Sequence, residues 1–167
     1  MAIAHLIDRP VPGSVTQSGM PASPRPLNAG HMQFPATATT PRRAREYTDW
    51  FLGLCGFTRE AIETAQLVVS ELTTNAFTAT GNDSEAHRPA HAEPASAGII
   101  DLSLRHFSDR LLIEVIDSSQ KQPVLANPDA DMEHGRGVWL VASLSREWGY
   151  FPVHSGKCVY SVLNVPG

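Results

Sequence analysis

The chain has 167 residues, which is enough for one domain with its own core and too few for two. With 42% hydrophobic and 18% charged residues it has a globular composition, and its net charge of −4 argues against a broad nucleic-acid interface. No apolar run approaches the roughly 18 residues that cross a bilayer. The two cysteines lack a CxxC pattern, so we expect reduced thiols in a cytoplasmic protein. From the charge and the short apolar runs, we expect no direct contact to nucleic acid or membrane.

The N-terminal segment is predicted to be a disordered tail over residues 1–32. Its first thirty residues hold five prolines among Ser, Thr and Gly and show no apolar period, so they offer little surface to bury. One domain is then expected over residues 33–167, opening with a short strand at "MQF".

Two helices are predicted next. The first should begin at Thr40, with Pro41 in the first helical position, and should stop at Gly56. Its predicted inward stripe is Ala44, Tyr47, Phe51 and Leu54. The second should run from Thr58 to about Thr80 and end at Gly81, before a polar insertion over residues 82–98. Its predicted inward residues are Ile62, Ala65, Val69, Leu72 and Ala76.

The apolar period then changes from helical to two. Residues 99–107 and 110–117 alternate around a hairpin at Ser108–Asp109, and the second of these strands is apolar on both faces. A polar stretch leads to a helix after Gly137, and strands over 146–153 and 158–165 close the chain. This order predicts an α+β two-layer sandwich, with helices on one face of a mixed, mostly antiparallel sheet.

Three local patterns are candidates for chemistry. Glu71 and Asn75 in "SELTTNA" are four residues apart and share a helix face, which suits a hard cation and a general base. The alternative is the solvent face of an amphipathic helix. Asp117 continues the apolar face of its strand and needs a partner, which a ligand amino group could be; alternatively, it begins an Asx turn.

The third pattern is Gly135-Arg136-Gly137 at the start of a helix, where backbone N–H groups can meet an anion. It lacks the preceding strand and the third small residue of a dinucleotide-binding fingerprint. The alternative is a simple glycine hinge.

Together these patterns resemble the GHKL ATPase superfamily over about residues 33–167. Within it, "ELTTNA" and "GRGVWLVASLSREWG" are similar to the RsbW/SpoIIAB-type anti-sigma factor serine kinases. In this resemblance the N box corresponds to Glu71 and Asn75, the first glycine box to Asp117, the second to Gly135 and Gly137, and the ATP lid to residues 118–134.

The resemblance implies ATP and Mg²⁺ as cofactors. Asn75 would bind Mg²⁺, Glu71 would act as general base, and Asp117 would accept a hydrogen bond from the adenine amino group. The backbone N–H groups implied for the phosphates are those of Gly135, Arg136, Gly137 and Val138. The implied partners are a sigma factor and a STAS-like anti-anti-sigma protein, and a homodimer is also compatible with the family.

The resulting hypothesis is an ATP-binding anti-sigma regulator that phosphorylates a serine or threonine of its antagonist. The alternative is a nucleotide-dependent interaction switch with little or no phosphoryl transfer. The presence of both Glu71 and Asn75 favours the kinase. The sequence Asp117-Ser118-Ser119, in place of Asp-x-Gly, and a lid without glycine before Gly135 favour the switch.

Overall fold

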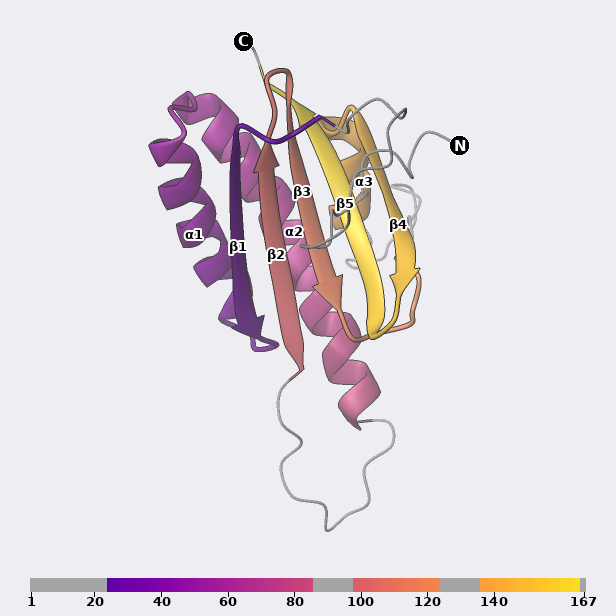
Figure 1. The fold of residues 1–167 in the computed structure, drawn as a ribbon. Coiled ribbons are helices and arrows are strands. Elements are labelled where there is room, and N and C mark those ends of the chain that lie inside the picture. The colour runs from indigo at the N-terminus through magenta and orange to yellow at the C-terminus, as the bar shows by residue number, and fades with distance from the viewer. Residues whose placement is uncertain (1–23, 86–97, 124–135, 166–167) are drawn as a thin grey trace, which may run out of the picture.

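The computed structural model describes residues 24–85, 98–123 and 136–165, which form two layers. Three helices lie on one face of a five-stranded sheet (Figure 1). The strands are β1 (Asn28–Pro35), β2 (Ile99–His106), β3 (Arg110–Asp117), β4 (Glu147–Val153) and β5 (Gly156–Asn164). The helices are α1 (Thr40–Leu54), α2 (Arg59–Glu85) and α3 (Arg136–Leu144). The predicted α+β two-layer sandwich is confirmed.

The sheet has the strand order β1-β2-β3-β5-β4. The four pairings among the described strands are all antiparallel, so the expected mixed sheet is antiparallel in this part of the chain. The predicted hairpin at Ser108–Asp109 joins β2 to β3. Central strand β3 is buried on both faces, as the apolar residues on both of its faces predict.

Helix α1 differs from the predicted pattern in its buried stripe. It ends before Gly56, whose φ of +79° is the left-handed conformation that glycine adopts easily. Leu54 is 71% exposed, whereas Leu52 is fully buried, so the prediction for Leu54 was wrong. The helix turns Leu52 and Phe51 together toward the sheet, and Leu54 lies two residues further round its surface.

Two boundaries also differ from the sequence-based expectation. Strand β1 begins at Asn28, within the segment expected to be a tail, because its whole length pairs with β2 down to Asn28 opposite His106. Helix α2 continues through Gly81 to Glu85, so five residues beyond Thr80 are helical. Gly81 is compatible with this, since a glycine inside a helix costs only about 1 kcal/mol relative to alanine.

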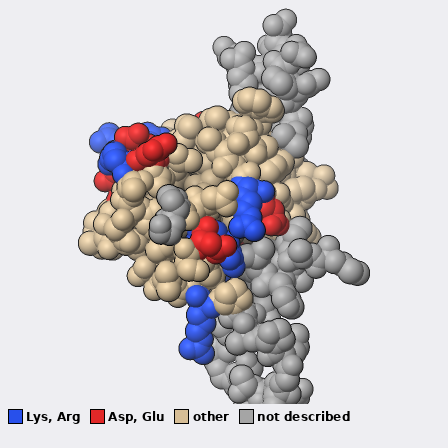
Figure 2. Space-filling view, turned by 90° about the horizontal axis from the view of Figure 1, so that it is seen from above, with Lys and Arg blue, Asp and Glu red and all other residues tan. Residues whose placement is uncertain are grey.

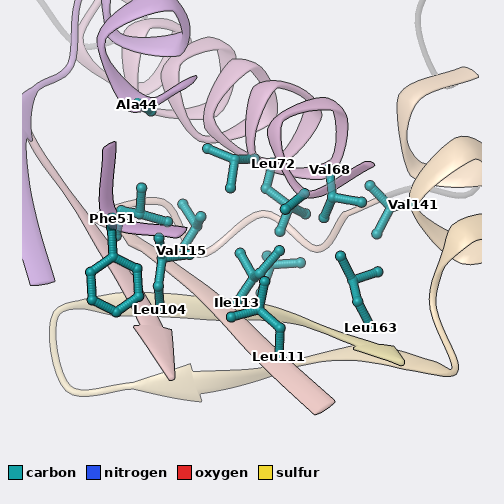
Figure 3. Close-up of a cluster of buried hydrophobic side chains, with 14 of the residues drawn as sticks. Ala44, Phe51, Val68, Leu72, Leu104, Leu111, Ile113, Val115, Val141 and Leu163 are labelled. Carbon is teal, nitrogen blue, oxygen red and sulfur yellow. The ribbon is translucent and has the colours of Figure 1, made fainter. Parts of the chain in front are cut away.

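The core lies between α2 and the sheet (Figure 3). Figure 3 shows Val68 and Leu72 of α2 above Ile113 of β3, with Val141 of α3 beside Val68. The five residues predicted to face inward on α2 are all buried. Burying one such aliphatic side chain contributes about 1.5–3 kcal/mol, so this contact fixes the position of α2 over the strands.

The end of the molecule with the α1–α2 turn and the β2–β3 hairpin carries paired charges. Arg59 contacts Asp49 at 2.7 Å, and Arg110 contacts Asp109 at 2.7 Å. Figure 2 looks onto this end and shows acidic and basic side chains next to one another. Both cysteines are free, and no helix in the described ranges has the length and apolar character needed to traverse a bilayer.

Candidate functional site

The site is built on the middle of α2, on a face beside the residues that pack on the sheet. Glu71 and Asn75 are half-buried, while Leu72 and Ala76 beside them are fully buried. The predicted separation between a polar face and the core stripe is therefore confirmed. In residues 24–85, 98–123 and 136–165, the side chains of Glu71 and Asn75 form no hydrogen bond or ion pair, so both are available to a ligand.

Helix α3 brings Gly137 directly against Glu71. A Cβ atom added to Gly137 would overlap Oε2 of Glu71 and lie 3.2 Å from its Cδ atom. Only glycine at this position leaves room for the carboxylate in its present orientation. The structure thus brings together the Glu71–Asn75 pattern and the glycine pattern at the start of α3, although Glu71 and Gly137 are 66 residues apart in the chain.

The first turn of α3 supplies the backbone amides expected at this place. Helix α3 begins at Arg136, and Val138 anchors the turn, since it is 5% exposed. The first N–H groups of a helix have no acceptor within the helix and are well placed for an anion. Gly135 and residues 124–134 of the expected lid lie outside the described residues.

Asp117 is the last residue of β3 and is 2% exposed. Its Oδ1 atom accepts a hydrogen bond of 2.8 Å from the backbone N–H of Ser119, which is the Asx turn that the sequence left as an alternative. The same Oδ1 atom accepts a second hydrogen bond of 2.8 Å from Nζ of Lys157. The buried carboxylate therefore has a protein cation as partner.

Lys157 is the residue that sequence reasoning missed. It is 6% exposed and lies directly opposite Asp117 in the β3–β5 pairing. A signal was present, because Lys157 continues the period-two face of Val159 and Leu163, which points to the core. A lysine on the inward face of an apolar strand indicates a buried acidic partner.

Two close approaches fix the end of β3 relative to its neighbours. A Cβ atom at Gly156 would overlap the carbonyl oxygen of Asp117, so β5 can start where it does only with glycine there. A Cβ atom at Gly98 would lie 2.6 Å from Cγ2 of Thr80 and 3.3 Å from Oγ of Ser118. The lower end of α2 thus lies beside the residue that follows Asp117.

These contacts give the site two ends along α2. Glu71 and Gly137 mark one end, and Thr80 with Ser118 marks the other, about 14 Å further along the helix at 1.5 Å per residue. One end offers a carboxylate, an amide oxygen and helix N–H groups, and the other offers a buried carboxylate held by a lysine. An elongated ligand with an anionic part and a polar part matches this division.

The donor set also fits a magnesium ion that has few protein ligands. Among the described residues there is no cluster of three His, Cys, Asp or Glu side chains. Mg²⁺ in phosphate-binding sites usually takes one or two protein oxygens and completes its shell with phosphate oxygens and water. The unpaired side-chain oxygen of Asn75 meets that requirement, so a metal held mainly by its ligand fits this site.

A cavity of about 230 Å³ lies elsewhere, at the other end of the molecule. It is lined by the α1–α2 junction and the end of β5, including Phe57, Thr58 and Leu163. None of the predicted site residues borders it, so it is separate from the arrangement around Glu71 and Asp117.

Comparison with known proteins agrees with this fold. The model of the histidine kinase-like ATPase domain family matches residues 34–162. A similar solved structure is that of the RsbU and RsbW domains of Rv1364c from Mycobacterium tuberculosis, with a TM-score of 0.55 and 17% sequence identity. The match covers 85% of this chain but 34% of that one, so this chain spans about a third of its length. No curated protein matches the chain.

Proposed function

Because the chain belongs to the histidine kinase-like ATPase domain family, we propose that it binds Mg·ATP between α2, the start of α3 and the end of β3. The observation that carries this proposal is the contact between Gly137 and the carboxylate of Glu71. It places the helix N–H groups that suit phosphates beside the polar face of α2. A fold-level match alone would leave the location of the ligand open.

Each end of the site then receives one part of the nucleotide. The N–H groups of Gly135, Arg136, Gly137 and Val138 bind the phosphates, and Asn75 donates its side-chain oxygen to the metal. Asp117 accepts a hydrogen bond from the adenine amino group. When bound, Mg²⁺ neutralises phosphate charge and orients the terminal phosphate.

We further propose that the protein is an anti-sigma regulator that phosphorylates its antagonist. The support is the similarity of the fold to a structure that contains an RsbW domain, together with the RsbW-like motifs of α2 and α3. The proposed partners are a sigma factor and a STAS-like antagonist, and the accepting group is a serine or threonine hydroxyl. A homodimer in the cytoplasm is the proposed working form.

In this proposal Glu71 takes the proton of the attacking hydroxyl. Its carboxylate lies beside the first turn of α3 and has no hydrogen-bond donor among the described residues, so it is free to accept that proton. Phosphoryl transfer needs mostly positioning and charge neutralisation, which the backbone amides of α3 supply.

A second function, a nucleotide-dependent switch without phosphoryl transfer, has one observation in its favour. Ser119 stands where the family motif has glycine, and its N–H group is already bound to Asp117. Ser119 is also 1% exposed, so both its burial and its hydrogen bond to Asp117 restrain this turn. A lid that begins on a fixed turn can report nucleotide binding without closing efficiently over the phosphates.

Two substitutions separate kinase from switch. Glu71→Gln keeps the shape of the side chain and removes proton acceptance, so Mg·ATP binding should persist while phosphate transfer falls about 10²–10⁴-fold. Asn75→Ala removes the metal contact, so Mg·ATP should bind more weakly. Transfer of radiolabelled γ-phosphate to purified STAS-domain proteins of the same organism, measured beside calorimetric affinity, tests both.

The outcomes distinguish the two functions. A wild-type protein that binds Mg·ATP and a partner but transfers no phosphate is a switch, and Glu71→Gln should then match it in ATP-dependent partner binding. An Asn75→Ala protein with unchanged Mg·ATP affinity would contradict the site itself.

A further inference from the structure

A buried ion pair closes the base-binding end of the proposed site. Nζ of Lys157 lies 2.8 Å from Oδ1 of Asp117, and the two side chains are 7% and 2% exposed. Nζ also donates a longer hydrogen bond of 3.4 Å to the backbone carbonyl of Ser119. The ammonium group therefore contacts both the carboxylate and the turn that begins the segment after β3.

The backbone makes this pair rigid. Asp117 and Lys157 are direct partners in the β3–β5 ladder, and Gly156 lets β5 start against the carbonyl oxygen of Asp117. The N–H group of Ser119 fixes the carboxylate from its own strand. The sheet therefore sets the backbone positions of both charged residues.

We propose that Lys157 is the positioning residue that sets base choice: it holds Asp117 ionised and in one orientation, so that this end of the site takes adenine and rejects guanine. The inference rests on the proposed binding of Mg·ATP and adds to it a role for a residue outside the family motifs discussed above.

The physical reason is the donor and acceptor character of a carboxyl group. An ionised carboxylate only accepts hydrogen bonds, so it matches the amino group of adenine and repels the carbonyl oxygen of guanine. A protonated carboxyl group also donates and can satisfy that oxygen. The ammonium group of Lys157 favours the ionised form of Asp117, so removing it should shift the carboxyl group toward the protonated form and weaken the discrimination.

Cys158 and Glu71 are titratable groups on two of the elements packed around the pair. Cys158 follows Lys157 on β5 with its side chain on the opposite face, and burial, with Glu114 as a second cause, raises its pKa to about 12. Glu71 is the charged site residue on α2, and its carboxylate lies against Gly137. Among the described residues, Lys157 is the cation that contacts Asp117.

The test measures the affinities of Mg·ATP and Mg·GTP by calorimetry between pH 5.5 and 8.5 for the whole protein and three variants. Lys157→Met should lower Mg·ATP affinity about tenfold to a hundredfold, the usual worth of a hydrogen bond to a charged group. The loss should grow as the pH falls, while the wild type stays flat. Lys157→Arg, which keeps the charge, should restore the flat profile.

The double variant Asp117→Asn/Lys157→Met keeps the test decisive if the single variant does not fold. Its neutral amide both donates and accepts, so it should bind Mg·ATP without pH dependence and with little preference over Mg·GTP. Thermal unfolding of each variant shows whether it is folded at the temperature of the measurement.

Three results would overturn the inference. The first is a folded Lys157→Met protein whose Mg·ATP affinity and its pH dependence match the wild type. The second is a loss of Mg·ATP affinity of the same size at every pH, which would indicate a packing effect alone. The third is a double variant that still prefers Mg·ATP over Mg·GTP as strongly as the wild type does. A wild-type protein that binds no Mg·ATP would instead remove the proposed function, which is a distinguishable result.

Discussion

Among the described residues, one buried and one partly buried ion pair lie on opposite faces of the sheet, and they differ in what surrounds them. Asp117 and Lys157 lie on the face that the helices cover, at the end of β3 and beside the turn at Ser119. Arg105 near the end of β2 and Glu114 in the middle of β3 lie on the other face, with Arg105 Nε 3.0 Å from Glu114 Oε2. Both pairs join neighbouring strands.

The surroundings decide what each pair can do. The Arg105–Glu114 pair shares its face with a small apolar cluster of Leu112, Tyr160 and Val162, and no predicted site residue borders it. Asp117–Lys157 lies at a strand end, where β3 leaves the sheet and the expected lid begins. A buried charge inside a sheet is a structural element, whereas the same charge at a strand end is a candidate for ligand contact.

The largest effect is expected for Asp117→Ala. The substitution leaves the ammonium group of Lys157 buried without a partner, which costs about 3–5 kcal/mol of unfolding free energy, and it removes the acceptor for the base. Urea unfolding and calorimetry with Mg·ATP measure the two losses. Asp117→Ala/Lys157→Met is the matched control and should regain stability but not nucleotide binding. A folded Asp117→Ala protein with wild-type affinity would contradict the role of Asp117.

Gly137→Ala is expected to act on chemistry rather than on stability. Its methyl group would displace the carboxylate of Glu71, and a misplacement of about 1 Å can cost on the order of 10²-fold in rate. Phosphate transfer is the measurement, with circular dichroism as the check on folding. Gly53→Ala on α1 is the control, because a Cβ atom there meets nothing within 4 Å. Equal transfer rates for the two variants would argue against Glu71 as the base.

Glu114→Ala breaks the pair on the other face and should leave the site intact. Arg105 loses its partner, but it is 20% exposed and can turn to water, so a loss of about 1–3 kcal/mol of unfolding free energy is expected. Mg·ATP affinity should stay at the wild-type value. A parallel fall in affinity would mean that the two faces are coupled and would break the comparison.

The smallest effect is expected for Arg42→Ala, which removes a surface pair. Arg42 and Glu46 lie 2.9 Å apart on α1 with most of both side chains in water. Such i,i+4 pairs contribute about 0.3–0.5 kcal/mol, and less at high salt. Urea unfolding at low and high salt measures the contribution of this pair to the free energy of unfolding. A loss above about 1 kcal/mol in Arg42→Ala would show that exposure alone does not predict the contribution of such pairs.

Local pattern was sufficient for much of the fold and for the positions of two candidate site residues. The alternation in 110–117 predicted β3 and its hairpin, and the spacing of Glu71 and Asn75 placed both on one polar face of α2. Each of these features depends on residues within one element. The motif order was also enough to predict the family, and the match over residues 34–162 confirms it.

What local pattern could not provide was contact between distant segments. The partner of Asp117 is 40 residues away, and the pairing depends on the register between β3 and β5, which no single segment specifies. The exposed Leu54 has the same origin, since the helical period allowed either Leu52 or Leu54 to face inward. The orientation of α1 on the sheet decided between them.

The glycine at the start of β5 has a consequence for how this chain can change over generations. With Gly156 pressed against the carbonyl oxygen of Asp117, any side chain there forces β5 away from β3 and shifts Lys157 with it. Strand β4 is attached to β5 through the turn that ends at Gly156, with Val153 paired to it. Substitution at Gly156 would therefore disturb the β4–β5 hairpin and the Asp117–Lys157 pair together, so we expect descendants of this chain that keep the proposed base-binding end to keep glycine at this position.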